Sequence, residues 1–254
     1  TPVSTLFPYT TLFRSKNLQY CVAHRNGEEY YVRGTFTRYN MDFTTDVEDM
    51  LDHGFPAVSM EPVVGEDTEA YSIKEEDLPR VKAEYDRLAK LFIQREEEGR
   101  PFFFFHFNMD LWKGPCLPKR LRGCGAGHEY LAVVPNGDIY PCHQFVGREG
   151  YVLGNVYEGL KNMKMMHDFR TNHVFTKPEC VDCWAKFFCS GGCHANNEAF
   201  AGDIHKPYHI TCEIQKKRVE CAMMIQAYNQ LKKPSVMAQP GTYEAKREAA
   251  ERQQ

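Results

Sequence analysis

Residues 180–193 read CVDCWAKFFCSGGC and place four cysteines close together near the middle of the second half of the chain. Three more cysteines, Cys124, Cys142 and Cys212, lie on either side of this stretch. We find no secretory signal, so we expect a cytoplasmic protein whose thiols stay reduced. Closely spaced reduced thiols are typical of metal ligands rather than disulfide partners, and sulfur ligands favour zinc or iron-sulfur clusters. The sequence therefore predicts a domain built around metal.

The number of cysteines indicates how many metal centres to expect. A single zinc ion needs four ligands, usually from two short Cys-x2-Cys pairs, whereas only Cys180 and Cys183 form such a pair here. Two four-iron clusters need about eight sulfurs. The pattern therefore favours two iron-sulfur clusters, one of which is a ligand short or is completed by Cys116. A zinc site and a set of disulfides are the less favoured alternatives.

The wider pattern resembles a known family. Cys124, the run NGDIYPC at residues 136–142, the cysteines of residues 180–193 and Cys212 are similar to the seven-cysteine SPASM domain, the auxiliary-cluster domain of radical SAM peptide maturases. Within that group, the stretch from Tyr30 to Lys232 most resembles the maturases of SCIFF peptides, which are small cysteine-rich precursors. The runs VRGTFTRY at residues 32–39 and SIKEEDLP at residues 72–79 carry this likeness. The resemblance implies thioether formation between a cysteine sulfur and the backbone carbon of a threonine.

The resemblance also implies which cysteine serves which cluster. Cys124, Cys142 and Cys193 would hold the first auxiliary cluster, and Cys180, Cys183, Cys189 and Cys212 would hold the second. Cys116 could be the fourth ligand of the first cluster; otherwise one iron is left open to coordinate a substrate cysteine. Gly191 and Gly192 either bring backbone N–H groups to cluster sulfur or form a plain turn. Cys21 and Cys221 match no ligand position and are expected to be ordinary thiols.

Two histidines directly follow ligand positions. His143 stands where sulfatase maturases carry an aspartate, and this difference favours a peptide cross-linker over formylglycine formation. His194 either contacts the ligand beside it or is a surface imidazole. The surface position is the favoured alternative.

The resemblance implies further cofactors and partners. The family generates its radical with S-adenosylmethionine and a third four-iron cluster, held by a Cys-x3-Cys-x2-Cys loop that these 254 residues lack. We therefore expect a fragment of a radical SAM enzyme that forms no 5′-deoxyadenosine by itself. The implied partners are a cysteine-rich precursor peptide and an electron donor of the flavodoxin or ferredoxin type, in an anaerobic bacterium. The alternatives are another SPASM enzyme, such as a sulfatase maturase, or a stand-alone iron-sulfur or zinc module.

Four segments are expected along the chain. The run TLFPYTTLFRS at residues 5–15 looks like translated sequencing adapter, so residues 1–15 are expected to be artefactual and disordered; a natural N-terminal arm is the alternative. Residues 16–110 would be the C-terminal half of a radical SAM barrel, residues 111–232 the SPASM domain and residues 233–254 a mobile tail. With 43% hydrophobic residues, 26% charged residues and a net charge of -3, the composition gives no reason to expect nucleic-acid or membrane binding.

Short apolar runs alternate with helical patterns between residues 30 and 107. Strands are expected at residues 30–36, 57–60 and 102–107, with helices at residues 44–51, capped by Thr44 or Thr45, and at residues 74–98. This alternation predicts parallel strands, consistent with part of a (β/α) barrel, so the fold class is α/β plus a small α+β domain. The run Phe102–Phe105 is expected in the core rather than against substrate. Glu61 ends a strand, where a barrel places its cofactor site, so it either faces the cavity or has a structural role, and neither alternative is favoured.

The cysteine-rich part shows its own local signals. Asn136 and Gly137 separate two apolar runs and predict a tight hairpin in which both residues have positive φ. Helices are expected at residues 158–169 and 211–231, the second carrying Cys212 near its start. Residues 180–193 are expected to form loops with one or two turns. The charges on the helix at residues 74–98 are expected to form a solvated face.

Overall fold

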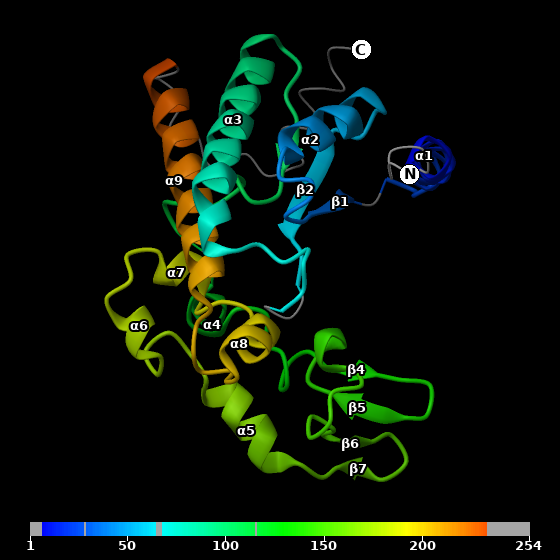
Figure 1. Ribbon diagram of the computed structural model, residues 1–254, viewed down its shortest axis with the longest axis vertical. Helices are drawn as coiled ribbons and strands as arrows, with labels where there is room; N and C mark the ends of the chain where they lie inside the picture. Colours follow the sequence, from blue (N-terminus) through cyan, green and yellow to red (C-terminus); the bar gives the residue numbers. More distant parts are fainter. Residues whose placement is uncertain (1–6, 28, 65–67, 115, 233–254) are drawn as a thin grey trace.

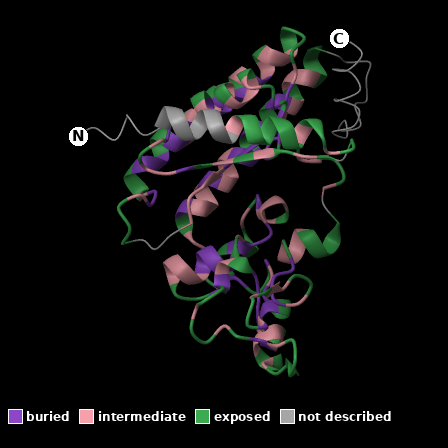
Figure 2. Cartoon of the chain, turned by 90° about the vertical axis from the view of Figure 1, so that its right-hand side faces the viewer, coloured by how far each residue is buried: buried purple, intermediate pink, exposed green. Residues whose placement is uncertain are grey.

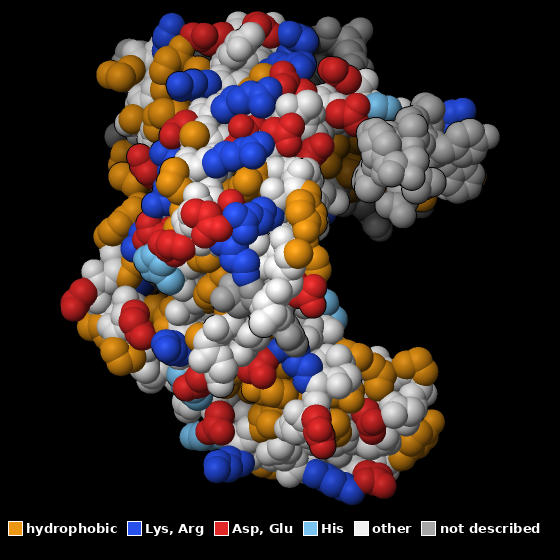
Figure 3. Space-filling model, viewed as in Figure 1, with side chains coloured by type: hydrophobic (Ala, Val, Ile, Leu, Met, Phe, Trp, Pro, Cys, Tyr) orange, Lys and Arg blue, Asp and Glu red, His pale blue; other side chains and the backbone are white. Residues whose placement is uncertain are grey.

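The computed structural model describes residues 7–27, 29–64, 68–114 and 116–232, and the expected tail at 233–254 lies outside them. The chain forms two parts, each with its own sheet (Figure 1). One sheet has three strands and the other has four. In the space-filling view the surface is deeply hollowed between the two parts (Figure 3). No helix in the described ranges has both the length and the apolar character needed to cross a membrane.

The three-stranded sheet is parallel. Its strands β1 (Val32–Phe36), β2 (Ala57–Pro62) and β3 (Phe103–Phe104) lie in the order β1-β2-β3. Parallel neighbours need a long connection. Helix α2 (Phe43–Asp52) supplies the first, and the short helix η2 (Glu75–Asp77) with α3 (Leu78–Glu97) supplies the second. The predicted strand and helix alternation is confirmed.

The start of α2 differs from the prediction. Its N-cap is Asp42, whose side chain makes no capping hydrogen bond, so the expected cap at Thr44 or Thr45 is wrong. Thr44 is buried, and its backbone N–H donates to Glu84 Oε1 at 2.9 Å. A carboxylate from the neighbouring helix α3 therefore accepts a hydrogen bond from a backbone N–H group at the start of α2. Glu84 is consequently an exception to the predicted solvated face.

The third strand is shorter than predicted. The N–H of Phe105 still donates to Val58 O, but regular pairing covers only Phe103 and Phe104. Phe102 and Phe104 are buried, whereas Phe105 is 45% exposed. Successive side chains of an extended chain point to opposite faces, and here one face of the run is open. The expectation of a continuous core run is therefore wrong for Phe105.

One apolar core joins the parallel sheet to two long helices. Helices α3 and α9 (His209–Lys232) lie side by side (Figure 1). On α3, Val81, Tyr85 and Leu88 are buried. Ile214 and Ile225 from α9 lie in the same core. The last helix thus packs with the parallel sheet, although its first turn carries Cys212, a residue of the cysteine-rich part (Figure 2 shows the buried segments).

The four-stranded sheet is an antiparallel meander. Its strands are β4 (Ala132–Val133), β5 (Asp138–Tyr140), β6 (Gly154–Asn155) and β7 (Gly159–Leu160). The predicted hairpin between β4 and β5 is present, but only Gly137 has a positive φ, of 89°. The side chain of Asn136 instead accepts the N–H of Asp138 at 3.1 Å. One left-handed residue with a side-chain contact therefore replaces the two left-handed residues predicted.

Short helices build the remainder of this part. They are α4 (Leu117–Arg122), η3 (His143–Phe145), α5 (Met163–Thr171), α6 (Pro178–Val181), α7 (Lys186–Cys189) and α8 (His194–Ala201). The helix predicted at residues 158–169 begins later, because β7 occupies its first residues and Asn162 caps α5 by accepting the N–H of Met165. The predicted turns within residues 180–193 and the last helix are confirmed.

The N-terminal segment is helical. Helix α1 covers Phe7–Ala23 and so includes residues 7–15 of the segment expected to be artefactual and disordered, while residues 1–6 lie outside the described ranges. Proline is tolerated in the first turn of a helix because no N–H donor is needed there, and Pro8 is the second residue of α1.

Candidate metal centres

Four thiols meet where α6, α7 and α9 approach one another. Cys180 lies in α6, Cys189 is the last residue of α7, and Cys212 lies in the first turn of α9; Cys183 lies between α6 and α7. Each of the four sulfurs interacts electrostatically with the other three. We call this set the four-thiol group. It contains the cysteines assigned from sequence to the second cluster.

Three other thiols meet at the ends of different elements. Cys142 is the N-cap of η3, Cys193 is the N-cap of α8, and Cys124 lies just after α4. Each of the three interacts electrostatically with the other two. We call this set the three-thiol group. It contains the cysteines assigned from sequence to the first cluster.

Backbone N–H groups point at three of the sulfurs. The donors are Gly191 and Gly192 to Cys189, Gln144 and Phe145 to Cys142, and Ala195 and Asn196 to Cys193. Burial raises the pKa of all three thiols, and these N–H groups act against it because they stabilise the thiolate. Hydrogen bonds to sulfur also tune iron-sulfur clusters. Of these donors, the sequence indicated only the two glycines.

The chemistry of the donors suits a thiolate-bound cluster. Burial raises the pKa of Cys180 to about 11 and that of Cys212 to about 12. A metal that binds these groups must therefore displace protons at neutral pH. Within the described ranges, no three His, Cys, Asp or Glu side chains have the spacing for a single metal ion. Ligands of a multi-iron cluster lie farther apart, because iron and sulfide atoms occupy the space between them.

A short turn connects the two groups. It runs from Cys189 to Cys193 through Ser190, Gly191 and Gly192, which have φ values of 61°, 83° and 80°. Three consecutive left-handed residues are rarely adopted without glycine. The carbonyl oxygen of Gly191 accepts hydrogen bonds from Lys177 Nζ at 2.7 Å and from Asn197 Nδ2 at 3.3 Å.

The environment of His194 corrects one expectation. The residue is only 3% exposed, so the favoured surface position is wrong. Its ring contacts Phe169, with 5.4 Å between centroids, and its Nδ1 lies 3.3 Å from Asn172 Nδ2. Burial lowers the pKa of His194 to about 3. The first turn of α8 is buried throughout, which no short-range pattern in the sequence revealed.

The other cysteines lie apart in the fold. Cys116 is exposed and forms the N-cap of α4, and its role as a ligand stays a prediction. Cys21 is exposed on α1. Cys221 is 1% exposed in the apolar core, and its Sγ donates to Tyr85 O at 3.6 Å.

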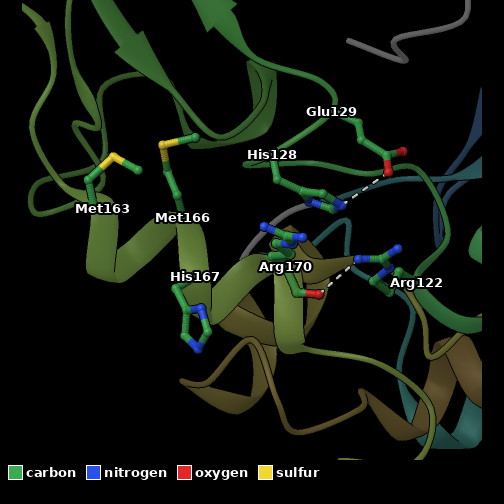
Figure 4. A pocket seen from close by; sticks show the side chains of 7 residues that line it. All are labelled: Arg122, His128, Glu129, Met163, Met166, His167 and Arg170. Carbon is green, nitrogen blue, oxygen red and sulfur yellow. Dashed lines mark hydrogen bonds and ion pairs between the residues drawn. The ribbon is translucent and has the colours of Figure 1, made fainter.

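A pocket of about 510 Å³ lies in the cysteine-rich part (Figure 4). Its lining consists of Arg122, His128, Glu129, Met163, Met166, His167 and Arg170. Arg122 precedes Cys124 by two positions, and its NH1 donates to Arg170 O at 3.2 Å. No pattern in the sequence indicated this pocket, because its walls come from α4, the loop after it and α5.

A second polar site lies at the end of β2. Glu61 Oε1 is 2.7 Å from His106 Nε2, and Glu61 Oε2 is 3.1 Å from an NH2 donor of Arg218 on α9. Arg218 also donates to Tyr85 Oη at 2.8 Å and to Met60 O at 3.1 Å. The sequence singled out Glu61 but neither His106 nor Arg218. The role of Glu61 toward a cofactor stays a prediction.

The charges of this site follow from its burial and its contacts. Burial opposes ionisation of Glu61, but Arg218 and His106 outweigh it and lower the Glu61 pKa to about 2. Burial, reinforced by Arg218, lowers the pKa of His106 to about 4. At neutral pH the site therefore contains a carboxylate, a neutral imidazole that donates from Nε2, and a guanidinium.

Comparison with known proteins bears on both parts. Residues 124–184 match the SPASM family, described as an iron-sulfur cluster-binding domain. This segment is a SPASM domain. The match ends before Cys189, Cys193 and Cys212, which the fold brings back to the cysteines of the matched segment. No curated protein matches the sequence.

Solved structures show a similar fold. Polyhistidine-tagged anSMEcpe with bound AdoMet has a TM-score of 0.64 at 17% identity, with 94% of this chain and 61% of that chain covered. Native anSMEcpe with bound AdoMet has a TM-score of 0.60 at 16% identity, with 84% of this chain and 60% of that chain covered. Native anSMEcpe with bound AdoMet and Cp18Cys peptide has a TM-score of 0.59 at 16% identity, with 85% of this chain and 62% of that chain covered.

The chain therefore has the fold of the C-terminal part of a radical SAM barrel followed by a SPASM domain. It spans about three fifths of the length of these solved structures.

Proposed function

We propose that this chain is part of a radical SAM enzyme that forms Cys-to-Thr thioether cross-links in a cysteine-rich ribosomal precursor peptide. The observation that carries the proposal is the sorting of seven cysteines into a four-thiol and a three-thiol group within a SPASM fold. In this proposal each group holds one auxiliary four-iron cluster. S-adenosylmethionine and a third cluster belong to the whole enzyme.

The two groups differ in a way that suits two roles. The four-thiol group has a full set of protein ligands for a four-iron cluster, whereas the three-thiol group lacks one. When bound, such clusters supply electron transfer and, at an open iron, a site for sulfur. A substrate cysteine or Cys116 would complete the three-thiol group. Cys142 and Cys193 each have two backbone N–H donors, which would stabilise the negative charge of the three-thiol group.

Residues outside the thiol groups have proposed roles toward the peptide. His143 follows Cys142, is exposed, and its Nδ1 lies 3.0 Å from Tyr130 Oη. The pair could position or deprotonate a polar group of the peptide near the three-thiol group. Glu61 and His106 would present a carboxylate and a neutral imidazole at the end of β2, where barrels bind their ligands.

The partners follow from the same proposal. The substrate would be a small cysteine-rich peptide, and anSMEcpe, whose fold is similar, was solved with Cp18Cys and Kp18Cys peptides. An external flavodoxin or ferredoxin would supply electrons in the cytoplasm of an anaerobic bacterium. Because these residues contain no Cys-x3-Cys-x2-Cys loop, we do not assign cleavage of S-adenosylmethionine to this chain alone.

The fold likeness to anSMEcpe supports a second candidate, another SPASM enzyme such as a sulfatase maturase. His143 argues against it, since sulfatase maturases resemble this chain but carry aspartate at that position. The products separate the candidates. Mass spectrometry of a peptide treated with the complete enzyme would show the loss of two hydrogens and a linked pair of residues for each thioether, whereas formylglycine carries no link.

Metal content tests the proposal directly. Anaerobically purified and reconstituted chain should contain about eight irons and about eight sulfides, because two four-iron clusters each bring four of both. Iron and acid-labile sulfide are measured on the same sample, with zinc as the comparison. About one zinc and no sulfide would exclude both clusters and leave a zinc-stabilised module.

A further inference from the structure

Lys177 is a buried lysine beside both thiol groups. It is 0% exposed and is the N-cap of α6, three residues before Cys180. Lysine is almost never fully buried without a partner, because removing an ammonium group from water costs free energy. The position therefore needs a reason within the protein.

The side chain of Lys177 runs along the turn that connects the groups. Its Nζ donates to Gly191 O at 2.7 Å. A Cβ at Gly191 would lie 3.2 Å from that Nζ and 3.5 Å from Cδ, so the glycine leaves the space that the lysine fills. Gly191 lies between Cys189 of the four-thiol group and Cys193 of the three-thiol group. The ammonium group thus holds the peptide that links the two.

The charge of Lys177 reaches both groups. It interacts electrostatically with Cys180, Cys189 and Cys212 of the four-thiol group and with Cys193 of the three-thiol group. Burial lowers the pKa of Lys177, and all four sulfurs act in the opposite direction. Deprotonated sulfurs would favour the charged form of Lys177 more strongly, since attraction between unlike charges is stronger away from water.

Among the described residues, Lys177 forms no ion pair with a carboxylate. The carboxylate of Asp203 interacts weakly with its charge, but Asp203 is exposed and pairs with His205 at 2.9 Å. Lys216, the other lysine near the four-thiol group, is different. Its Nζ lies 2.8 Å from Glu213 Oε1, so a carboxylate offsets its charge. Lys177 is therefore the buried ammonium group available to sulfur at both sites.

Resting on the two-cluster proposal above, we propose that Lys177 is a positioning residue shared by both cluster sites. Its ammonium group compensates the negative charge of both thiolate-bound clusters and holds the Gly191 turn between them. Net charge and burial are among the factors that set cluster reduction potential. One lysine would therefore raise the reduction potentials of both clusters. An electron added to one cluster would weaken the compensation that the same ammonium group gives to the negative charge of the other cluster.

The test compares three variants in the anaerobically reconstituted chain. Lys177→Met removes the charge and keeps an unbranched side chain; Lys177→Arg keeps the charge. Lys164→Met is the matched control, because Lys164 is an exposed residue of α5. Iron and sulfide content and the midpoint potential of each cluster, from redox titration followed by electron paramagnetic resonance, are measured for all of them.

We expect Lys177→Met to shift both potentials to more negative values, or to lose iron from both sites, while Lys177→Arg stays closer to the parent. A shift or loss at one site alone would overturn the shared role. So would Lys177→Met matching Lys164→Met, or Lys177→Met and Lys177→Arg behaving alike. If the parent chain itself binds no iron, the cluster proposal fails instead, and the two failures are distinguishable.

Discussion

Replacing Cys183 with alanine should remove about half of the iron from the reconstituted chain, because one of two four-iron clusters is lost. Cys183 belongs to the four-thiol group, in which each sulfur interacts with the other three. A four-iron cluster that loses one of its thiolates is strongly weakened. At most about four irons should therefore remain, held by the three-thiol group. A partial loss from that group would lower the number further, because the Gly191 turn links the two sites.

Two further variants make this result specific. Cys142→Ala should give the complementary loss, from the three-thiol group, with a different change in the electron paramagnetic resonance spectrum of the reduced protein. Cys21→Ala is the control, because that thiol is exposed on α1. Iron content that stays at the parent value in Cys142→Ala would show that our assignment of ligands to the first cluster is wrong.

Replacing Arg218 with methionine should lower the free energy of unfolding by about 3–5 kcal/mol. The side chain of Arg218 is 7% exposed and pairs with Glu61, while its Nε donates to Tyr85 Oη. Removing one partner of a buried pair leaves the other charge uncompensated, and this is the source of the large cost. Urea unfolding of the reconstituted protein, followed by its helical circular dichroism at neutral pH, measures the effect.

Arg87→Met is the matched control for that experiment. Arg87 is 50% exposed and pairs with Glu48 and Glu84, so its loss should cost less than about 1 kcal/mol. Adding Glu61→Gln to Arg218→Met should restore part of the stability, since the uncompensated carboxylate disappears. Equal effects of the two arginine variants would mean that the Glu61 site adds no more to stability than a surface ion pair.

The same site predicts the direction of the pH dependence. Glu61 has a folded pKa of about 2 against an ordinary value of 4.5, so its contribution is present above pH 4.5 and is lost as the pH falls toward 2. His106 has a folded pKa of about 4 against 6.5, so acid favours its unfolded, charged form below 6.5. Both groups therefore destabilise the fold on acidification.

The features that could be predicted from sequence are those with a short-range cause. The helical pattern of residues 74–98 predicted α3, and the Asn-Gly pair predicted the hairpin. The cysteine spacing, with the family it resembles, predicted two sets of thiols, and the sulfurs within each set interact electrostatically, while their role as cluster ligands stays a prediction. Ends of elements were less predictable, as at α2, where Glu84 from another helix occupies the role expected of a threonine.

The features that could not be predicted depend on partners far apart in the chain. Lys177 reads as an ordinary polar residue before a proline, and only the folded turn at Gly191 explains its burial. Arg218 reads as one of several charges on a helix, yet it reaches Glu61 from more than a hundred and fifty positions away. His194 is buried for the same reason. Local pattern carries no information about such contacts.

Helix α9 has a consequence for building hybrid enzymes. Cys212 and Arg218 lie six positions apart on it, roughly 9 Å along the axis, and one enters the four-thiol group while the other enters the barrel core. A SPASM segment transplanted with this helix onto a foreign barrel would bring a guanidinium into an apolar interior. The recipient would need an acid at the position of Glu61 and a hydroxyl at that of Tyr85. The two parts are thus exchangeable only as a matched pair.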